Sequence, residues 1–167
     1  ATIAVAGIAG TGSTTLAKDG SARLALSSTL VGFSRVQVNA GELAVSGTAI
    51  NHSSTHFVLA DAADAVLSFD LSAVVALIGD LSGGGSTGGV VRPGGTAPLT
   101  LTLAGATDAT FGGSLRDNGE ALLLFAKTGA GHQTLTGENT YTGPTILSAG
   151  RVTLAGNGSI LNSAVTL

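Results

Sequence analysis

Apolar and small polar residues along this chain come in runs that are too short for helices. Residues 127–156 read KTGAGHQTLTGENTYTGPTILSAGRVTLAG, in which short runs such as TLT, TIL and VTL alternate with Gly, Asn-Thr or Ala-Gly. Residues 57–71 alternate like strands around Ala-rich corners, and residues 99–103 read as a further strand. A helical period of 3.6 residues is hard to find anywhere. The pattern therefore predicts short β-strands joined by tight turns.

A glycine-rich stretch, GGGSTGG at residues 83–89, interrupts this pattern. Apolar runs flank it closely on both sides, so we interpret it as a turn within the β-structure rather than a flexible tether. The same glycines match the GxGxxG spacing of dinucleotide sites. Such a site needs a helix after the glycines, and Val90, Val91 and Pro93 follow here instead.

The chain repeats itself. Residues 17–20 (AKDG) return as residues 126–129 (AKTG), 109 positions later. At the same offset, residues 39–43 (NAGEL) match residues 148–152 (SAGRV). We place one repeat at about 16–55 and a second at about 125–167, with a spacer between them and no domain boundary within 1–167. Periodic self-similarity of this kind is typical of solenoids.

The amino-acid composition limits the classes of fold and of binding partner that the chain can have. The 167 residues include 26 Gly, 10% charged and 4% aromatic residues, with no Cys, Met or Trp. Small and β-branched residues suit narrow interiors and ladders of strands. A net charge of −3 with seven scattered Lys and Arg residues argues against nucleic acid as a partner. The absence of Cys excludes disulfides and thiolate zinc sites.

The start of the chain and its apolar content bear on its processing. No run of about 18 apolar residues is present, so we expect no membrane insertion by this segment. The first ten residues, ATIAVAGIAG, lack the basic region of a signal peptide. Because the chain contains no Met, we expect a processed piece or an expressed fragment of something longer.

Residues 127–156 closely resemble the passenger-associated repeat of bacterial autotransporters, whose usual wording is KTGxGTLTLTGANTYTGGTTVNAGTLxL. Residues 74–91 and 109–115 are similar to the spacer words of that family, so the resemblance covers roughly residue 16 to the end. The first repeat is degenerate, with LSSTLVGFSRV in place of LTGENTYTGPTI.

The resemblance implies an all-β, right-handed parallel β-helix, a solenoid at the bacterial cell surface or secreted. Coils of about 20 to 25 residues would give about seven to eight coils. In such a fold each strand lies about 4.8 Å above the equivalent strand of the coil before. Inward positions would then form ladders of like apolar side chains, and no coil buries its apolar face alone.

Candidate catalytic and metal-binding residues are few. Residues 7–14 (GIAGTGST) have the glycines of a phosphate loop, but Ser13 replaces its Lys, so we expect a turn between strands. His52 and His56, if on one strand, would lie about 13 Å apart, too far to share a metal. We therefore expect two solvent-facing histidines.

Carboxylates are the remaining candidates, because some polysaccharide-degrading enzymes are also β-helices. Asp61, Asp64, Asp70 and Asp80 form the only cluster. Asp61 and Asp64 lie in an Ala-rich stretch where Asp is a routine turn residue. We assign no catalytic, cofactor-binding or metal residue and expect no cofactor, with a β-helix polysaccharide-active enzyme as the third alternative.

The function that these observations favour is structural. We expect a stiff stalk that presents an adhesive or effector region beyond the cell surface. The alternative is a non-enzymatic adhesin, with a host or neighbouring-cell surface ligand, or a self-associating fibre subunit. Open β-helix ends with unpaired strand edges would permit self-association.

Two side-chain predictions test the fold. We expect inward ladders to include Leu135, one of Ile146 and Leu147, and one of Val152 and Leu154, because strand side chains alternate between faces. Phe33 and Tyr141 should occupy equivalent corners of the two repeats, each packed over a turn.

Overall fold

A computed structural model of the chain describes residues 2–5, 8–27, 30–47, 50–71 and 75–167. These residues form strands and turns and no helix. The strands are β1 (Thr2–Val5), β2 (Ile8–Lys18), β3 (Arg23–Leu26), β4 (Leu30–Val38), β5 (Glu42–Gly47), β6 (Ile50–His52), β7 (His56–Leu59), β8 (Val66–Leu71), β9 (Val75–Ile78), β10 (Leu81–Gly83), β11 (Val90–Pro93), β12 (Leu99–Leu103), β13 (Ala109–Phe111), β14 (Ser114–Leu115), β15 (Leu123–Lys127), β16 (His132–Leu135), β17 (Thr145–Leu147), β18 (Arg151–Leu154) and β19 (Val165–Thr166).

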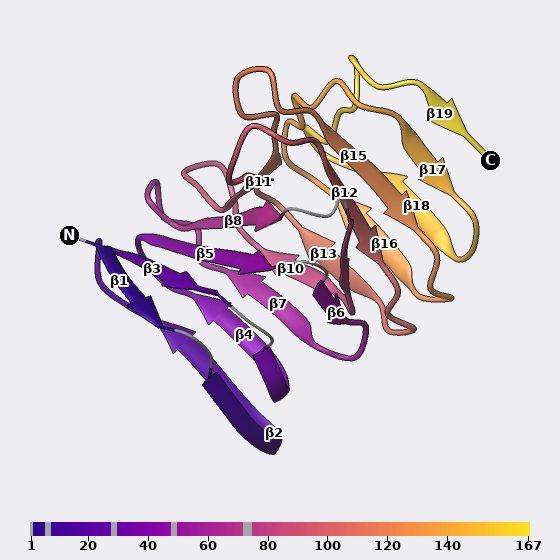
Figure 1. Ribbon diagram of the computed structural model, residues 1–167. Helices are drawn as coiled ribbons and strands as arrows, with labels where there is room; N and C mark the ends of the chain where they lie inside the picture. The colour runs from indigo at the N-terminus through magenta and orange to yellow at the C-terminus, as the bar shows by residue number, and fades with distance from the viewer. Residues whose placement is uncertain (1, 6–7, 28–29, 48–49, 72–74) are drawn as a thin grey trace.

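The strands stack into three parallel sheets that wind along one axis (Figure 1). Sheet A has the order β1-β3-β5-β8-β11-β14, sheet B the order β18-β16-β13-β10-β7-β4-β2, and sheet C the order β19-β17-β15-β12-β9-β6. A full coil visits sheets A, C and B in turn, as in β8, β9 and β10. The first two levels contain strands of sheets A and B, and sheet C begins at β6. The two termini lie at opposite ends of the stack.

This arrangement confirms the parallel β-solenoid predicted from the sequence. Sheet B has seven strands among the described residues, close to the seven to eight coils expected. The handedness of the coil stays a prediction. Coil length varies: Phe57 pairs with Leu81, 24 positions on, whereas Gly83 pairs with Phe111, 28 positions on. The corner loops absorb the difference, so the strands remain in register.

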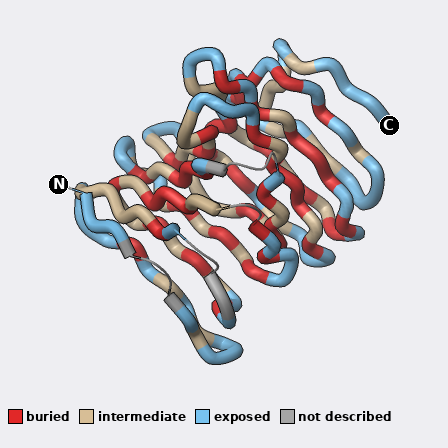
Figure 2. The backbone as a smooth tube through the Cα atoms, in the orientation of Figure 1, coloured by how far each residue is buried: buried red, intermediate tan, exposed pale blue. Residues whose placement is uncertain are grey.

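Apolar side chains from the three sheets form one buried core. Figure 2 shows that buried residues recur on successive strands along the stack. One ladder of sheet A contains Leu24, Leu43, Leu67, Val91 and Leu115, each a register partner of the next. In sheet B, Phe111 stacks on Leu135, and both side chains are buried. Each coil is therefore covered by its neighbours, and the core is continuous along the axis.

The predicted ladders of the second repeat are confirmed in part. Leu135 is buried, and its partner in the next coil is Leu154. Ile146 is 40% exposed, whereas Leu147 pairs with the buried Lys127. Only one member of that pair therefore points inward, as expected.

The expectation for Val152 and Leu154 is wrong in one respect. These two residues are two positions apart and pair with the buried Gln133 and Leu135, so both lie on the inward side. Period-2 alternation separates adjacent residues, not residues two apart. Leu154 is nevertheless 42% exposed, whereas Val152 packs against the core.

Candidate functional site

The two sequence repeats fold into the same corner unit, defined here as two stacked strand pairs on either side of one corner. In the first repeat, β2 pairs with β4 and β3 with β5. In the second, β15 pairs with β17 and β16 with β18. The register is the same at the 109-residue offset, because Lys18 pairs with Val38 as Lys127 pairs with Leu147.

The two corner units nevertheless lie at different corners of the solenoid. The first connects sheet B to sheet A, and the second connects sheet C to sheet B. The repeat therefore specifies a corner geometry and not one fixed side of the cross-section.

A buried lysine closes each corner unit. Lys18 Nζ donates to the carbonyl oxygens of Asp19, Gly20 and Ala40 at 3.0, 2.6 and 2.8 Å. Lys127 is 2% exposed, and its Nζ donates to the carbonyls of Gly105, at 3.4 Å, and Gly129. Burial lowers the pKa of Lys127, and nearby Asp80 partly opposes this shift. Each ammonium donates to several carbonyl oxygens of the turns and is thereby paired although it is buried.

A glycine with left-handed backbone follows in each unit. Gly41 has φ of 69° and Gly150 has φ of 74°. A Cβ on Gly41 would lie 2.5 Å from the carbonyl oxygen of Gly20, and one on Gly150 would lie 2.5 Å from that of Gly131. The glycine of the Ala-Gly motif, which has no Cβ, thus allows the backbone of one coil to approach the backbone of the coil before.

The ENTYTGP part of the second repeat is a hydrogen-bonded loop in which buried and exposed residues alternate, with Asn139, Tyr141 and Gly143 buried. Asn139 accepts from the backbone N–H of Leu115 at 2.9 Å and donates to the carbonyls of Gly137 and Ser159. Tyr141 is fully buried, with its hydroxyl 2.5 Å from Thr145 Oγ1 and its ring 6.4 Å from that of Phe125. Burial raises the pKa of the Tyr141 phenol. The predicted packing of Tyr141 is therefore confirmed.

The predicted equivalence of Phe33 and Tyr141 is wrong. Phe33 is also buried, at 6% exposure, but it lies within β4 of sheet B, whereas Tyr141 lies in the loop before β17. The position that matches Asn139 in the first repeat is Leu30. The amide of Asn139 ties its own turn to β14 and to the turn at Ser159. The first repeat has no such amide, and the chain there continues as a strand.

The four clustered aspartates do not gather on one face. Asp61 lies in the loop between β7 and β8, Asp70 in β8, and Asp80 in the loop between β9 and β10. Asp61 accepts from the backbone N–H groups of Thr87 and Gly88, at 2.8 and 2.9 Å, and Asp64 is exposed in the same loop. Asp80 accepts from the hydroxyl of Thr107.

Aspartate side chains at the corners form hydrogen bonds that connect one coil to the next. Asp117 accepts from the N–H of Thr142 at 3.0 Å, and Asp108 accepts from the N–H of His132 at 3.0 Å. Together with Asp61 and Asp80, they act as inter-coil clamps at the corners. Hydrogen bonds that a carboxylate accepts from backbone N–H groups are strong, so these aspartates have a structural role at the corners.

The histidine prediction is wrong for His52. His52 lies in β6 of sheet C and His56 in β7 of sheet B, on either side of a corner. His52 is 7% exposed with its ring 6.4 Å from that of Phe57, and burial lowers its pKa. His56 is half-buried, with Nε2 2.8 Å from Ser82 Oγ. The inward ladder position of His52, which pairs with Ile78, explains its burial.

The two glycine motifs also have structural roles. Residues 84–89 form the turn between β10 and β11, where the Gly85 N–H donates to the Gly88 carbonyl at 2.9 Å, as predicted. Residues 8–14 belong to β2, with an irregular register between Ala9 and Thr14, so the predicted turn between strands is wrong there. Gly7 lies outside the described residues.

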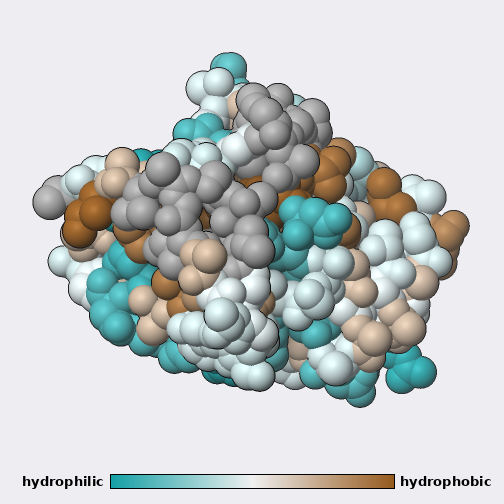
Figure 3. Space-filling model, turned by 60° about the horizontal axis from the view of Figure 1, so that its bottom comes forward, coloured by the Kyte–Doolittle hydropathy of each residue, from teal (hydrophilic) through white to brown (hydrophobic). Residues whose placement is uncertain are grey.

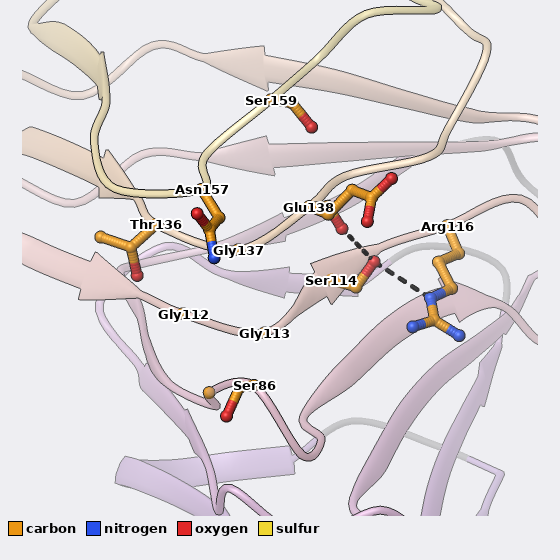
Figure 4. Close-up of a pocket in the computed structure, with 11 residues that line it drawn as sticks. Ser86, Gly112, Gly113, Ser114, Arg116, Thr136, Gly137, Glu138, Asn157 and Ser159 are labelled. Atoms are coloured by element: carbon orange, nitrogen blue, oxygen red, sulfur yellow. Dashed lines mark hydrogen bonds between the residues drawn. The ribbon is translucent and has the colours of Figure 1, made fainter.

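A polar groove lies at the corner where sheet B passes to sheet A (Figure 4). Its volume is about 450 Å³, and its lining consists of glycines and polar side chains: Gly85, Ser86, Gly112, Gly113, Ser114, Arg116, Thr136, Gly137, Glu138, Asn157 and Ser159. Arg116 Nε donates to Ser114 Oγ at 3.0 Å, and Ser114 Oγ donates to the Glu138 carbonyl at 2.6 Å. This chain of bonds fixes the guanidinium beside the groove.

The sequence reasoning missed the buried lysines, the inter-coil clamps and this groove. The lysines had a signal, because Lys18 and Lys127 occupy matching positions in the two repeats. The clamps also had one, since Asp108 and Asp117 precede the turns whose N–H groups donate to them by about one coil. Arg116 had no signal, as nothing in its local sequence sets it apart.

The described residues include no helix that could cross a bilayer. Within the same residues, no three His, Cys, Asp or Glu side chains come together as metal ligands would.

Comparison with known proteins identifies a known repeat in the part of the chain that contains the second corner unit. Residues 125–157 match the passenger-associated-transport-repeat family. A stretch of 71 residues, 42% of this chain, is 42% identical to the adhesin BmaC autotransporter of Brucella suis biovar 1 (strain 1330). The stretch spans about 2% of that protein's length. No solved structure matched the chain. The repeat, the similarity to an autotransporter adhesin and the parallel β-solenoid all fit a passenger-domain β-helix.

Proposed function

We propose that this segment is a stalk of a surface-exposed or secreted passenger, which spaces and presents an adhesive or effector region. The observation that carries the proposal is the stack of three parallel sheets, in which the corner units and the aspartate clamps bind one coil to the next. A stack of this kind resists bending because neighbouring coils share both hydrogen bonds and core contacts.

The role is non-enzymatic in this proposal. Two of the four clustered aspartates, Asp61 and Asp80, accept hydrogen bonds from neighbouring turns. Asp70 lies on a different element from both. The surface view in Figure 3 shows apolar residues in scattered patches rather than one broad area.

A coil deletion tests the stalk role. Phe57 and Leu81 are register partners, so removal of residues 57–80 deletes one coil and places β10 over β4 in the position of β7. In the protein that carries this chain, we expect the deletion variant to be displayed on the cell surface and to present its distal region normally. A deletion of residues 57–68 removes about half a coil, breaks the register and should reduce display.

The result that would overturn the proposal is a coil-deleted variant that is folded and displayed but no longer adheres. Such a result would assign adhesion to the side chains of this segment. The similarity to a protein named as an adhesin favours that second function, a direct adhesin. Surface display is measured by antibody labelling of intact cells, and adhesion by counting bound cells on the same samples.

A further inference from the structure

We propose that the groove at the B-to-A corner binds an acidic, hydroxyl-rich sugar chain, with a carboxylate of the sugar held by Arg116. This inference goes beyond the stalk role, which requires no ligand. It starts from the continuity of the groove across coils. A second hollow of about 140 Å³ adjoins the first and shares Gly85, Ser86, Ser114 and Arg116 with it. Arg116 therefore lies where the two hollows meet.

The guanidinium of Arg116 is oriented but not neutralised. Its Nε is bound to Ser114 Oγ, and no carboxylate pairs with it in the part of the chain that the structure describes. Arg23 and Arg92, in contrast, both pair with Glu42. The two terminal amino groups of a guanidinium match the two oxygens of a carboxylate in bidentate geometry. Arg116 is thus a pre-positioned group for an external anion.

The rest of the lining favours hydroxyl groups as neighbours of that anion. Ser86, Thr136 and Asn157 supply hydroxyls and an amide that can both donate and accept. The lining contains no aromatic ring on which a neutral sugar could stack, so charge must provide much of the affinity. A groove of several hundred Å³ is within the range of small-ligand sites.

Glu138 restricts the charge density of the ligand. It lines the same groove as Arg116 and is exposed. A densely charged polyanion would place a second negative group close to this carboxylate, which Coulomb repulsion opposes. A chain in which acidic and neutral sugars alternate avoids the repulsion and lets Glu138 accept from a hydroxyl. The groove should therefore prefer alternating uronic acid chains to heavily sulfated ones.

Isothermal titration calorimetry of this chain at low salt tests the proposal. The probes are oligosaccharides of alternating uronic acid and N-acetylhexosamine, a heparin oligosaccharide, a neutral N-acetylglucosamine oligosaccharide and an Asp-rich peptide. We expect the uronic acid chain to bind best and its affinity to fall as salt is raised. Arg116→Gln should weaken binding at least tenfold, and Arg116→Lys should weaken it by a smaller factor.

The matched control is Arg151→Gln, which removes the same charge from an exposed arginine at a different corner. It should leave binding unchanged, and both Gln variants should unfold at the same temperature as the parent. Three results would overturn the proposal: no heat from the uronic acid chain at millimolar concentration, equal binding by Arg116→Gln, or tighter binding of the heparin or peptide probe. None of these results bears on the stalk role, which the coil deletion tests separately.

Discussion

Replacement of Gly150 by Ala tests whether the corner unit depends on close approach between coils. Gly150 has φ of 74°, and its Cα faces the carbonyl oxygens of Gly129 and Gly131 in the coil before. A left-handed backbone costs an L-residue about 1–2 kcal/mol. Steric overpacking of a methyl group against fixed backbone adds about 1–3 kcal/mol. We therefore expect Gly150→Ala to lower the free energy of unfolding by about 2–5 kcal/mol.

Gly119→Ala is the matched control, because it measures the cost of the left-handed backbone alone. Gly119 has φ of 62°, but a Cβ there would meet nothing within 4 Å. Gly119→Ala should therefore cost only about 1–2 kcal/mol. Gly41→Ala, at the equivalent position of the first corner unit, should resemble Gly150→Ala, because its Cβ would lie 2.5 Å from the Gly20 carbonyl oxygen.

Equilibrium unfolding in urea, followed by circular dichroism, measures these differences. For a chain of this length, 1 kcal/mol corresponds to about 2–4 °C in Tm, so thermal melts provide a second measurement. If Gly150→Ala costs no more than Gly119→Ala, the close approach between coils has no energetic role. If Gly41→Ala behaves like Gly119→Ala, the two repeats are not the same structural unit.

Three further predictions concern the core, pH and association. Leu135→Asp buries an unpaired charge in a full ladder and should destabilise the fold by more than about 3 kcal/mol in urea titration, whereas Thr134→Asp, at the half-buried neighbour, should cost much less. Burial lowers the pKa of His52, so the unfolded chain binds a proton at higher pH than the folded chain does, and stability should fall as pH drops below about 6.5; an unchanged pH slope in His52→Leu would contradict this assignment. Light scattering over a concentration series should show self-association through the strand edges at the ends of the stack. The double variant Ala164→Lys, Thr166→Lys, which places charge in and next to β19, should reduce this association. A strictly monomeric parent chain at high concentration would refute the prediction.

The sequence predicted the class of fold but not which residues point inward at the corners. Short β runs between Gly and Asn turns are local signals, and the runs predicted at 134–136, 145–147 and 152–154 overlap β16, β17 and β18. Burial of Lys127 and His52 depends on ladder partners in the adjacent strand of sheet C, Leu103 and Ile78, which lie about one coil away in the sequence. Charged and titratable residues are usually read as exposed, so the pattern alone misassigned His52.

The groove could not be predicted for a similar reason. Its lining comes from four separate corner turns, which include Ser86, Ser114, Glu138 and Asn157. These residues come together because the coils are in register, and the register depends on loop lengths that vary from one coil to the next. Each turn by itself contains only residue types that are common in turns, so its local sequence gives no sign of the groove.

The 109-residue offset between the repeats has a geometric meaning. Lys18, Val38, Leu59, Gly83 and Phe111 are successive register partners in sheet B, so four coils separate Lys18 from Phe111. From Phe111 the chain passes through β14 of sheet A to Lys127 in sheet C. The offset is therefore four coils and two further faces, which is why the second unit occupies a different corner. Because the lysine, the Ala-Gly turn and the paired strands lie within a single corner, the unit needs only two stacked strand pairs and can form at whichever corner the preceding loops bring it to.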